Sequence, residues 1–123
     1  MLSDDDRAMA TAEHLREIAL SLPEATEKPM HGTPAFYVKT KFFTKLSHDG
    51  RTAVVHLDSL EEKEALLAAE PVQLTTTPHY DGYRIVLVVL SKVTKAELRE
   101  FVTKAWRLRA PKKLVAAFDA QQQ

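Results

Sequence analysis

The chain has 123 residues, with 17 basic and 17 acidic side chains and no cysteine. This length fits one domain over residues 1–123 with its own hydrophobic core, and the missing thiols exclude disulfides, thiolate metal sites and cysteine nucleophiles. No apolar run approaches the roughly 20 residues of a membrane span. The acidic start Met-Leu-Ser-Asp-Asp-Asp does not resemble a signal peptide. We therefore expect a soluble, cytoplasmic protein of bacterial type that makes no membrane contact.

Acidic and basic segments alternate along the chain. Residues 1–27 hold seven acids and two bases, and residues 57–83 hold six acids and one base. Residues 28–56 hold five bases and one acid, and residues 84–118 hold nine bases and two acids. A net charge of zero gives no argument for nucleic-acid binding. If the two basic segments meet in the fold, however, they form one positive patch; otherwise these charges are ordinary solvated surface.

The first half of the chain predicts a helix followed by three strands. Apolar residues at spacings of three and four predict a helix over 4–22, which ends before Pro23. Three prolines and a glycine over residues 23–34 predict a loop. Strands are expected at 35–38, 42–46 and 52–57, joined by tight turns at 39–41 and 48–50. Simple alternation places Phe42, Thr44 and Leu46 on one face of the second strand and Lys41, Phe43 and Lys45 on the other.

The second half predicts a helix, two strands and two more helices. Ser59 and Glu62 match a capping box that begins a helix over 60–69, and Thr94 and Glu97 match another. A short strand at 72–76 and a loop at 77–82 precede an apolar strand at 83–90, whose lack of alternation indicates that both faces are covered. Pro111 is expected to begin a last short helix, and residues 1–3 and 119–123 are expected to fray.

These elements have the order α-βββ-α-ββ-α-α and predict an α+β fold. We expect a two-layer arrangement in which a mainly antiparallel five-stranded sheet carries its helices on one face.

His31 and His79 are the candidate site residues among the five histidines, because each lies in a proline-flanked loop beside aromatic side chains such as Tyr80. Rigid loops hold binding groups, and histidine performs acid–base chemistry near neutral pH. The alternative is that both histidines stabilise their loops. No pair of histidines has helical ligand spacing, so we expect no metal and no cofactor.

Trp106 lies at the margin of an apolar helical stripe. It either packs in the core or offers its ring to a base or a partner protein. Basic residues that surround it in sequence, together with a basic hairpin, give the candidate nucleic-acid contacts Lys39, Lys41, Lys45, Arg107, Lys112 and Lys113.

Several segments in a fixed order resemble the MmcQ/YjbR family of small bacterial proteins. They are Leu20 to Glu27, His31-Gly32-Thr33-Pro34-Ala35-Phe36, Lys41-Phe42-Phe43, Thr77-Pro78-His79-Tyr80, Ala105-Trp106-Arg107-Leu108 and Pro111-Lys112-Lys113-Leu114. The resemblance implies a fold like that of secretion chaperones and a proposed double-wing mode of DNA binding.

Three hypotheses about function follow. The first is a non-catalytic module that binds double-stranded DNA weakly through the basic segments. The second is an adaptor that binds another protein, as a monomer or a homodimer. The third is an enzyme that uses His31 and His79.

Overall fold

The computed structural model describes residues 2–122 and contains one open, antiparallel sheet of six strands in the order β1-β2-β3-β4-β6-β5. The strands are β1 (Ala25–Met30), β2 (Thr33–Val38), β3 (Lys41–Leu46), β4 (Thr52–His56), β5 (Leu74–Thr75) and β6 (Ile85–Val89). The helices are α1 (Asp4–Arg7), α2 (Ala12–Ser21), α3 (Leu60–Ala69), α4 (Lys95–Arg109) and α5 (Lys112–Gln121), with short 3₁₀ helices η1 (Pro78–Tyr80) and η2 (Leu90–Lys92). The α+β class and the antiparallel sheet are confirmed.

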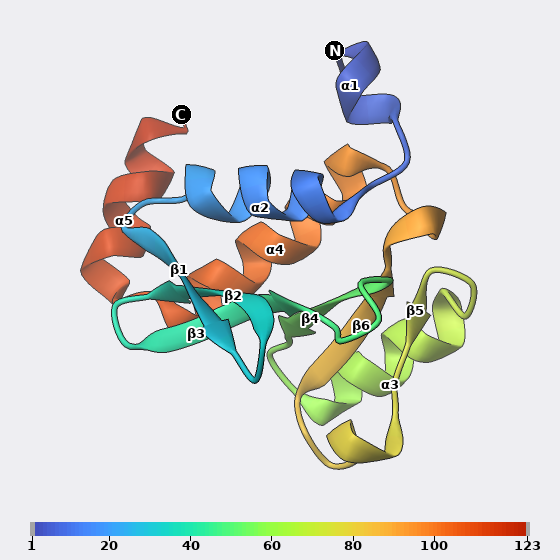
Figure 1. Cartoon of the computed structure of the whole chain (residues 1–123). Helices are drawn as coiled ribbons and strands as arrows, with labels where there is room; N and C mark the ends of the chain where they lie inside the picture. Colours follow the sequence, from blue (N-terminus) through green and yellow to red (C-terminus); the bar gives the residue numbers. More distant parts are fainter. Residues whose placement is uncertain (1, 123) are drawn as a thin grey trace.

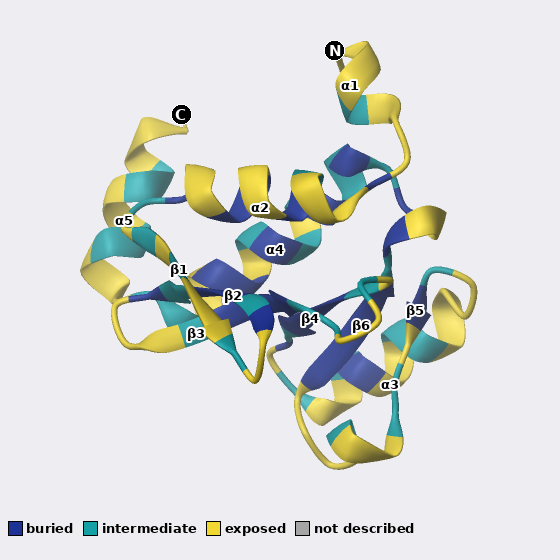
Figure 2. Ribbon diagram, viewed as in Figure 1, coloured by how far each residue is buried: buried dark blue, intermediate teal, exposed yellow. Residues whose placement is uncertain are grey.

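Helices cover one face of this sheet (Figure 1). Leu15 and Ile18 of α2 and Leu98 and Val102 of α4 pack with Phe36, Val38, Phe43, Val55, Val86 and Val88 of the strands. Partly buried side chains of α3 and α5 join the same cluster. Figure 2 shows most of β6 as buried, as its unbroken apolar sequence predicted; only its last residue, Val89, is half-buried. None of the helices within residues 2–122 has the length and apolar character needed to cross a membrane.

The sixth strand is β1, in a region expected to be a loop, so the five-strand prediction is wrong. Pro29 pairs with Pro34, and Met30 pairs with Thr33. The two residues between the strands, His31 and Gly32, have φ of 50° and 82°, as a two-residue hairpin turn requires. Because β1 lies at the sheet edge, a proline that cannot donate to the ladder is tolerated there.

The predicted first helix is two helices. Ala10 N donates to Val93 O (2.8 Å) and Lys95 N donates to Ala8 O (2.9 Å), so residues 8–10 bond to the segment before α4 and not to each other. Thr11 then caps α2 by accepting from His14 N (3.1 Å). Of the predicted frayed ends, residues 1 and 123 lie outside the described residues; α1 begins at Asp4 and α5 continues to Gln121.

A β-bulge at Phe43 changes which side chains of β3 share a face. Phe36 pairs with Thr44 and Tyr37 with Phe42, so Phe43 has no partner across the ladder. Phe43 is buried in the core under the helices, whereas Lys45 lines a cavity with Val54 and Leu87 on the opposite face. The predicted alternation, which placed Phe43 and Lys45 together, is therefore wrong, because a bulge shifts the period of two by one residue.

Candidate functional site

The structure brings part of the predicted basic set together at one end of the molecule. Arg109, the last residue of α4, donates from Nε to Phe42 O at the start of β3 (3.0 Å). This bond joins the β2–β3 turn to the connection between α4 and α5, and both lie at the same end of the fold in Figure 1. We call Lys39, Lys41, Arg109, Lys112 and Lys113 the basic end. The four lysines are exposed, and Lys39 forms an ion pair with Glu24.

Two predicted members of the basic set lie elsewhere. Arg107 forms an ion pair with Asp119 (2.5 Å) and lies over the ring of Phe118. Lys45, which was included as part of the basic hairpin, is buried on the sheet face opposite the main helices. Arg109 was not in the predicted set, although its position two residues before Pro111 indicates the end of a helix.

Trp106 is a core residue, so the idea that its ring is offered to a base or a partner is wrong. Its side chain is fully buried. The ring packs at 5.0 Å from that of Phe118, and Nε1 donates to Pro23 O (3.1 Å). Trp106 lines neither of the two cavities that contain His31 and His79.

His31, His79 and Tyr80 come together on the open face of the sheet. They line two cavities of about 400 and 210 Å³, and Lys45 is the fourth residue common to both. We call this pair of cavities the histidine groove. Its floor is apolar, because Val54, Ile85 and Leu87 are 2–8% exposed and form a second, smaller cluster with Tyr80. His48 also lines the larger cavity.

Two local structures position the rim of the histidine groove. His31 occupies the β1–β2 turn in a left-handed conformation. On the other side, the ammonium of buried Lys63 in α3 donates to Tyr80 O (2.7 Å) and Tyr83 O (3.1 Å), and this ties η1 and the loop after it to α3. The His79 ring meets the Tyr80 ring edge-on at 4.7 Å. Burial raises the pKa of the Tyr80 phenol, so its hydroxyl is protonated at neutral pH.

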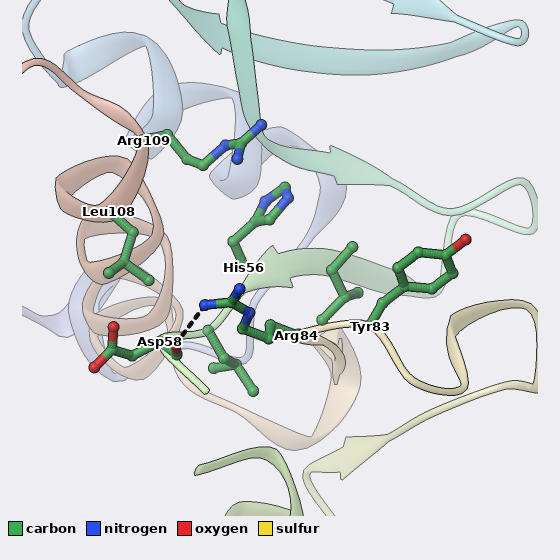
Figure 3. Close-up of a pocket in the computed structure, with 8 residues that line it drawn as sticks. His56, Asp58, Tyr83, Arg84, Leu108 and Arg109 are labelled. Carbon is green, nitrogen blue, oxygen red and sulfur yellow. Dashed lines mark hydrogen bonds between the residues drawn. The ribbon is translucent and has the colours of Figure 1, made fainter. Parts of the chain in front are cut away.

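A further cavity of about 410 Å³ lies beside His56 and is shown in Figure 3. The guanidinium of Arg109 faces the His56 ring, and Arg84 donates from Nη1 to Asp58 O (3.3 Å). Burial, followed by the positive charge of Arg109, lowers the pKa of His56 to about 4. His56 is therefore neutral near pH 7 and does not supply a proton there.

The described residues show no catalytic arrangement around either histidine. Ser47, the serine of the larger cavity, donates to Asp49 Oδ1 (2.7 Å) and accepts from Thr52 N (3.1 Å), so its hydroxyl belongs to the β3–β4 turn and not to a histidine. Within residues 2–122, no group of three or more His, Asp or Glu side chains is arranged to hold a metal ion. Among the described residues, the histidine groove therefore contains no paired nucleophile and base.

Comparison with known proteins places this fold in a family. A sequence model of the YjbR family matches residues 20–108, which contain the sheet, α3 and most of α4. The chain belongs to the YjbR family. The crystal structure of the Deinococcus radiodurans protein DR2400, with a DUF419 domain, is similar at a TM-score of 0.67 and 25% identity, over 81% of this chain and 78% of that one.

Curated relatives of this YjbR chain carry no functional name. The proteins Rv2570 of Mycobacterium tuberculosis and Mb2600 of Mycobacterium bovis, both named uncharacterized, are 52% identical to it over 58 residues. This match covers 47% of the chain and 45% of each relative, so the aligned segment spans less than half the length of the curated relatives.

Proposed function

We propose that this YjbR domain is a non-catalytic module that binds duplex DNA weakly through the basic end. The observation that carries the proposal is the bond from Arg109 to Phe42 O, because it joins two basic segments that are distant in sequence. The β2–β3 turn then reaches out as a wing, and Lys112 and Lys113 lie beside it. Such a surface suits the sugar-phosphate backbone, which lysines contact without reading sequence.

The distribution of acids supports the same surface. The acidic residues of α1 bond to the other end of α4, where Lys95 pairs with Asp5 and Arg99 pairs with Asp6 (2.7 Å). A helix of this length separates its ends by about 21 Å, more than two Debye lengths at physiological salt. The basic end therefore acts locally as a positive surface although the whole chain has no net charge.

An adaptor that binds proteins through β6 has less support. That hypothesis needs an exposed apolar sheet face, and the relevant side chains, Ile85 and Leu87, are 8% and 5% exposed.

Fluorescence anisotropy with a labelled duplex tests the proposal. With about four phosphates neutralised, we expect affinity that falls with salt at a log-log slope of about −3.6 and changes little with sequence. The double variant Lys112→Ala, Lys113→Ala should lower the affinity uniformly and flatten the slope by about two. The matched control is Lys28→Ala, Lys92→Ala, which removes the same charge from two exposed lysines outside the basic end and should leave the slope unchanged.

The ion pair between Lys39 and Glu24 gives a test in the opposite direction. Glu24→Gln frees the Lys39 ammonium for a phosphate and should tighten binding at low salt. The DNA proposal is abandoned if the chain does not bind at about 100 μM in low salt, since non-specific contacts usually reach about 10⁻⁴ M or tighter. Equal loss of affinity in the matched control would also reject the basic end as the contact surface.

A further inference from the structure

Three lysines of this chain are buried, and Lys45 differs from the other two. Lys63, 6% exposed, donates to two backbone carbonyls, and Lys95, also 6% exposed, pairs with Asp5 and Glu17. Lys45 is 7% exposed. Yet it takes part in none of the side-chain hydrogen bonds or ion pairs formed among residues 2–122. Its ammonium is not one of the buried polar atoms that lack a partner among the described residues, so the nitrogen reaches solvent at the cavities while the rest of the side chain is covered. A positive charge that opens into a cavity without a counter-ion from the chain is free to pair with the charge of a ligand.

The surroundings of Lys45 define the chemistry of that group. Neither cavity of the histidine groove is lined by a carboxylate. Neutral or cationic polar groups, namely the His31, His48 and His79 rings and the Tyr80 hydroxyl, surround the lysine instead. An anion is therefore complementary to the polar part of the groove.

The rest of the groove is apolar. Val54, Ile85 and Leu87 form its floor, and Met30 and Phe42 line the smaller cavity. The larger cavity, at about 400 Å³, has the size of a small-molecule site, and such sites are mostly apolar with a few convergent polar groups. Buried Lys63 also holds η1 in place, so one side of the groove is fixed before anything binds.

We propose that the histidine groove binds a small organic anion with an apolar body. Its carboxylate or phosphate is held by Lys45 and the histidines of the rim, and its apolar part lies on Ile85 and Leu87. The site is separate from the basic end, which shares no residue with it, so the DNA proposal and this one stand or fall independently.

Matched probes separate charge from apolar contact in the test. The probes are 2-naphthoate, 2-naphthyl phosphate and the uncharged 2-naphthamide, titrated into the full chain while amide NMR shifts are recorded. We expect shifts in Lys45, Val54, Tyr80 and Leu87, and an affinity for at least one anion about ten-fold above that for the amide, the size of effect a hydrogen bond to a charged group produces. The anion that binds more tightly then identifies the preferred headgroup, carboxylate or phosphate.

Variants of Lys45 test whether this lysine causes the preference for an anion over 2-naphthamide. Lys45→Met should remove the preference for the anion and leave the weak binding of 2-naphthamide, whereas Lys45→Arg should retain the preference. Lys113→Ala, a lysine of the basic end, is the control and should bind as the unaltered chain does. If Lys45→Met does not fold, His79→Ala gives the second measurement, because it should weaken the anions more than the amide.

Three results would overturn the proposal. The first is no amide shift in the groove with either anion at about 5 mM, well above the Kd of an ordinary weak ligand. The second is equal affinity for the anions and 2-naphthamide. The third is an anion preference that survives in Lys45→Met.

Discussion

His56 illustrates how a half-buried histidine contributes to the acid sensitivity of the fold. Its ring meets Phe42 edge-on at 4.7 Å, its Nδ1 has no hydrogen-bond partner among the described residues, and its pKa is lowered to about 4. In the unfolded chain the pKa of histidine is about 6.5. The native state therefore holds this ring neutral in a pH range where the unfolded chain binds a proton.

The sign of the resulting pH dependence follows directly. Between about pH 6.5 and pH 4 the unfolded state binds more protons at this site, so the free energy of unfolding falls as the pH falls through that window. Because the ring retains some contact with water, we expect a loss of about 1–2 kcal/mol. His56→Phe keeps the contact with Phe42 and should flatten this part of the profile. Urea denaturation followed by Trp106 fluorescence from pH 7.5 to pH 4 measures it, and parallel profiles would contradict the assignment.

Leu87 tests the second, smaller core at the same scale. It is 5% exposed and packs with Val54 and Ile85 on the sheet face that has no helices. Leu87→Ala should lower the free energy of unfolding by about 2–5 kcal/mol. Leu20→Ala, at a leucine that is 42% exposed, is the matched control and should change it by less than about 0.5 kcal/mol. A loss that small at Leu87 would mean that the strand is open to solvent.

At the scale of elements, the sequence predicted correctly those helix bounds and caps that depend on contacts between residues close in sequence. The helix over 60–69 was predicted at its observed bounds, and both capping serine and threonine side chains accept from the expected amides: Ser59 from Glu62 N (3.0 Å) and Thr94 from Glu97 N (3.1 Å). The reciprocal bond of Glu62 goes to Asp58 N (2.9 Å), one residue earlier than the motif requires.

The missed elements depend on partners distant in sequence. Nothing local separates residues 4–7 from 12–21; the break comes from bonds between residues 8–10 and the segment at 93–95. In the candidate sites, Lys41, Lys112 and Lys113 are exposed because they lie where elements begin, and their contact with nucleic acid stays a prediction. Lys45 and Trp106 were placed badly, because a bulge and the packing of α5 decide their surroundings.

The restart of the helix at Thr11 gives a prediction for the element. Its hydroxyl satisfies His14 N (3.1 Å), one of the amides that a helix start leaves without a partner. Thr11→Ala should lower the free energy of unfolding by about 1 kcal/mol, and Thr11→Ser, which retains the cap, should lower it little or not at all. Equal losses in the two variants, measured in urea, would show that the methyl group and not the hydroxyl matters here.

At the scale of the whole molecule, both edges of the open sheet are protected against pairing. The β5 edge has only two residues. At the other edge, Pro29 faces Pro34, and since neither can donate, they form a non-hydrogen-bonded pair in which the nitrogen of Pro29 points outward. The exposed Lys28 adds a charge beside it. Charges and prolines of this kind prevent two sheets from joining at their edges.

We therefore expect the chain to be a monomer of 13.8 kDa in light scattering at concentrations near 100 μM. The variant Lys28→Val, Pro29→Val restores an amide and removes the charge from β1, and it should dimerise or aggregate through this edge. Lys92→Val, which removes a lysine outside the sheet, is the control and should remain monomeric. If the double variant stays monomeric, the short β5 edge and the twist of the sheet are enough to prevent pairing between sheets. If the unaltered chain is a dimer, the molecule associates through another surface.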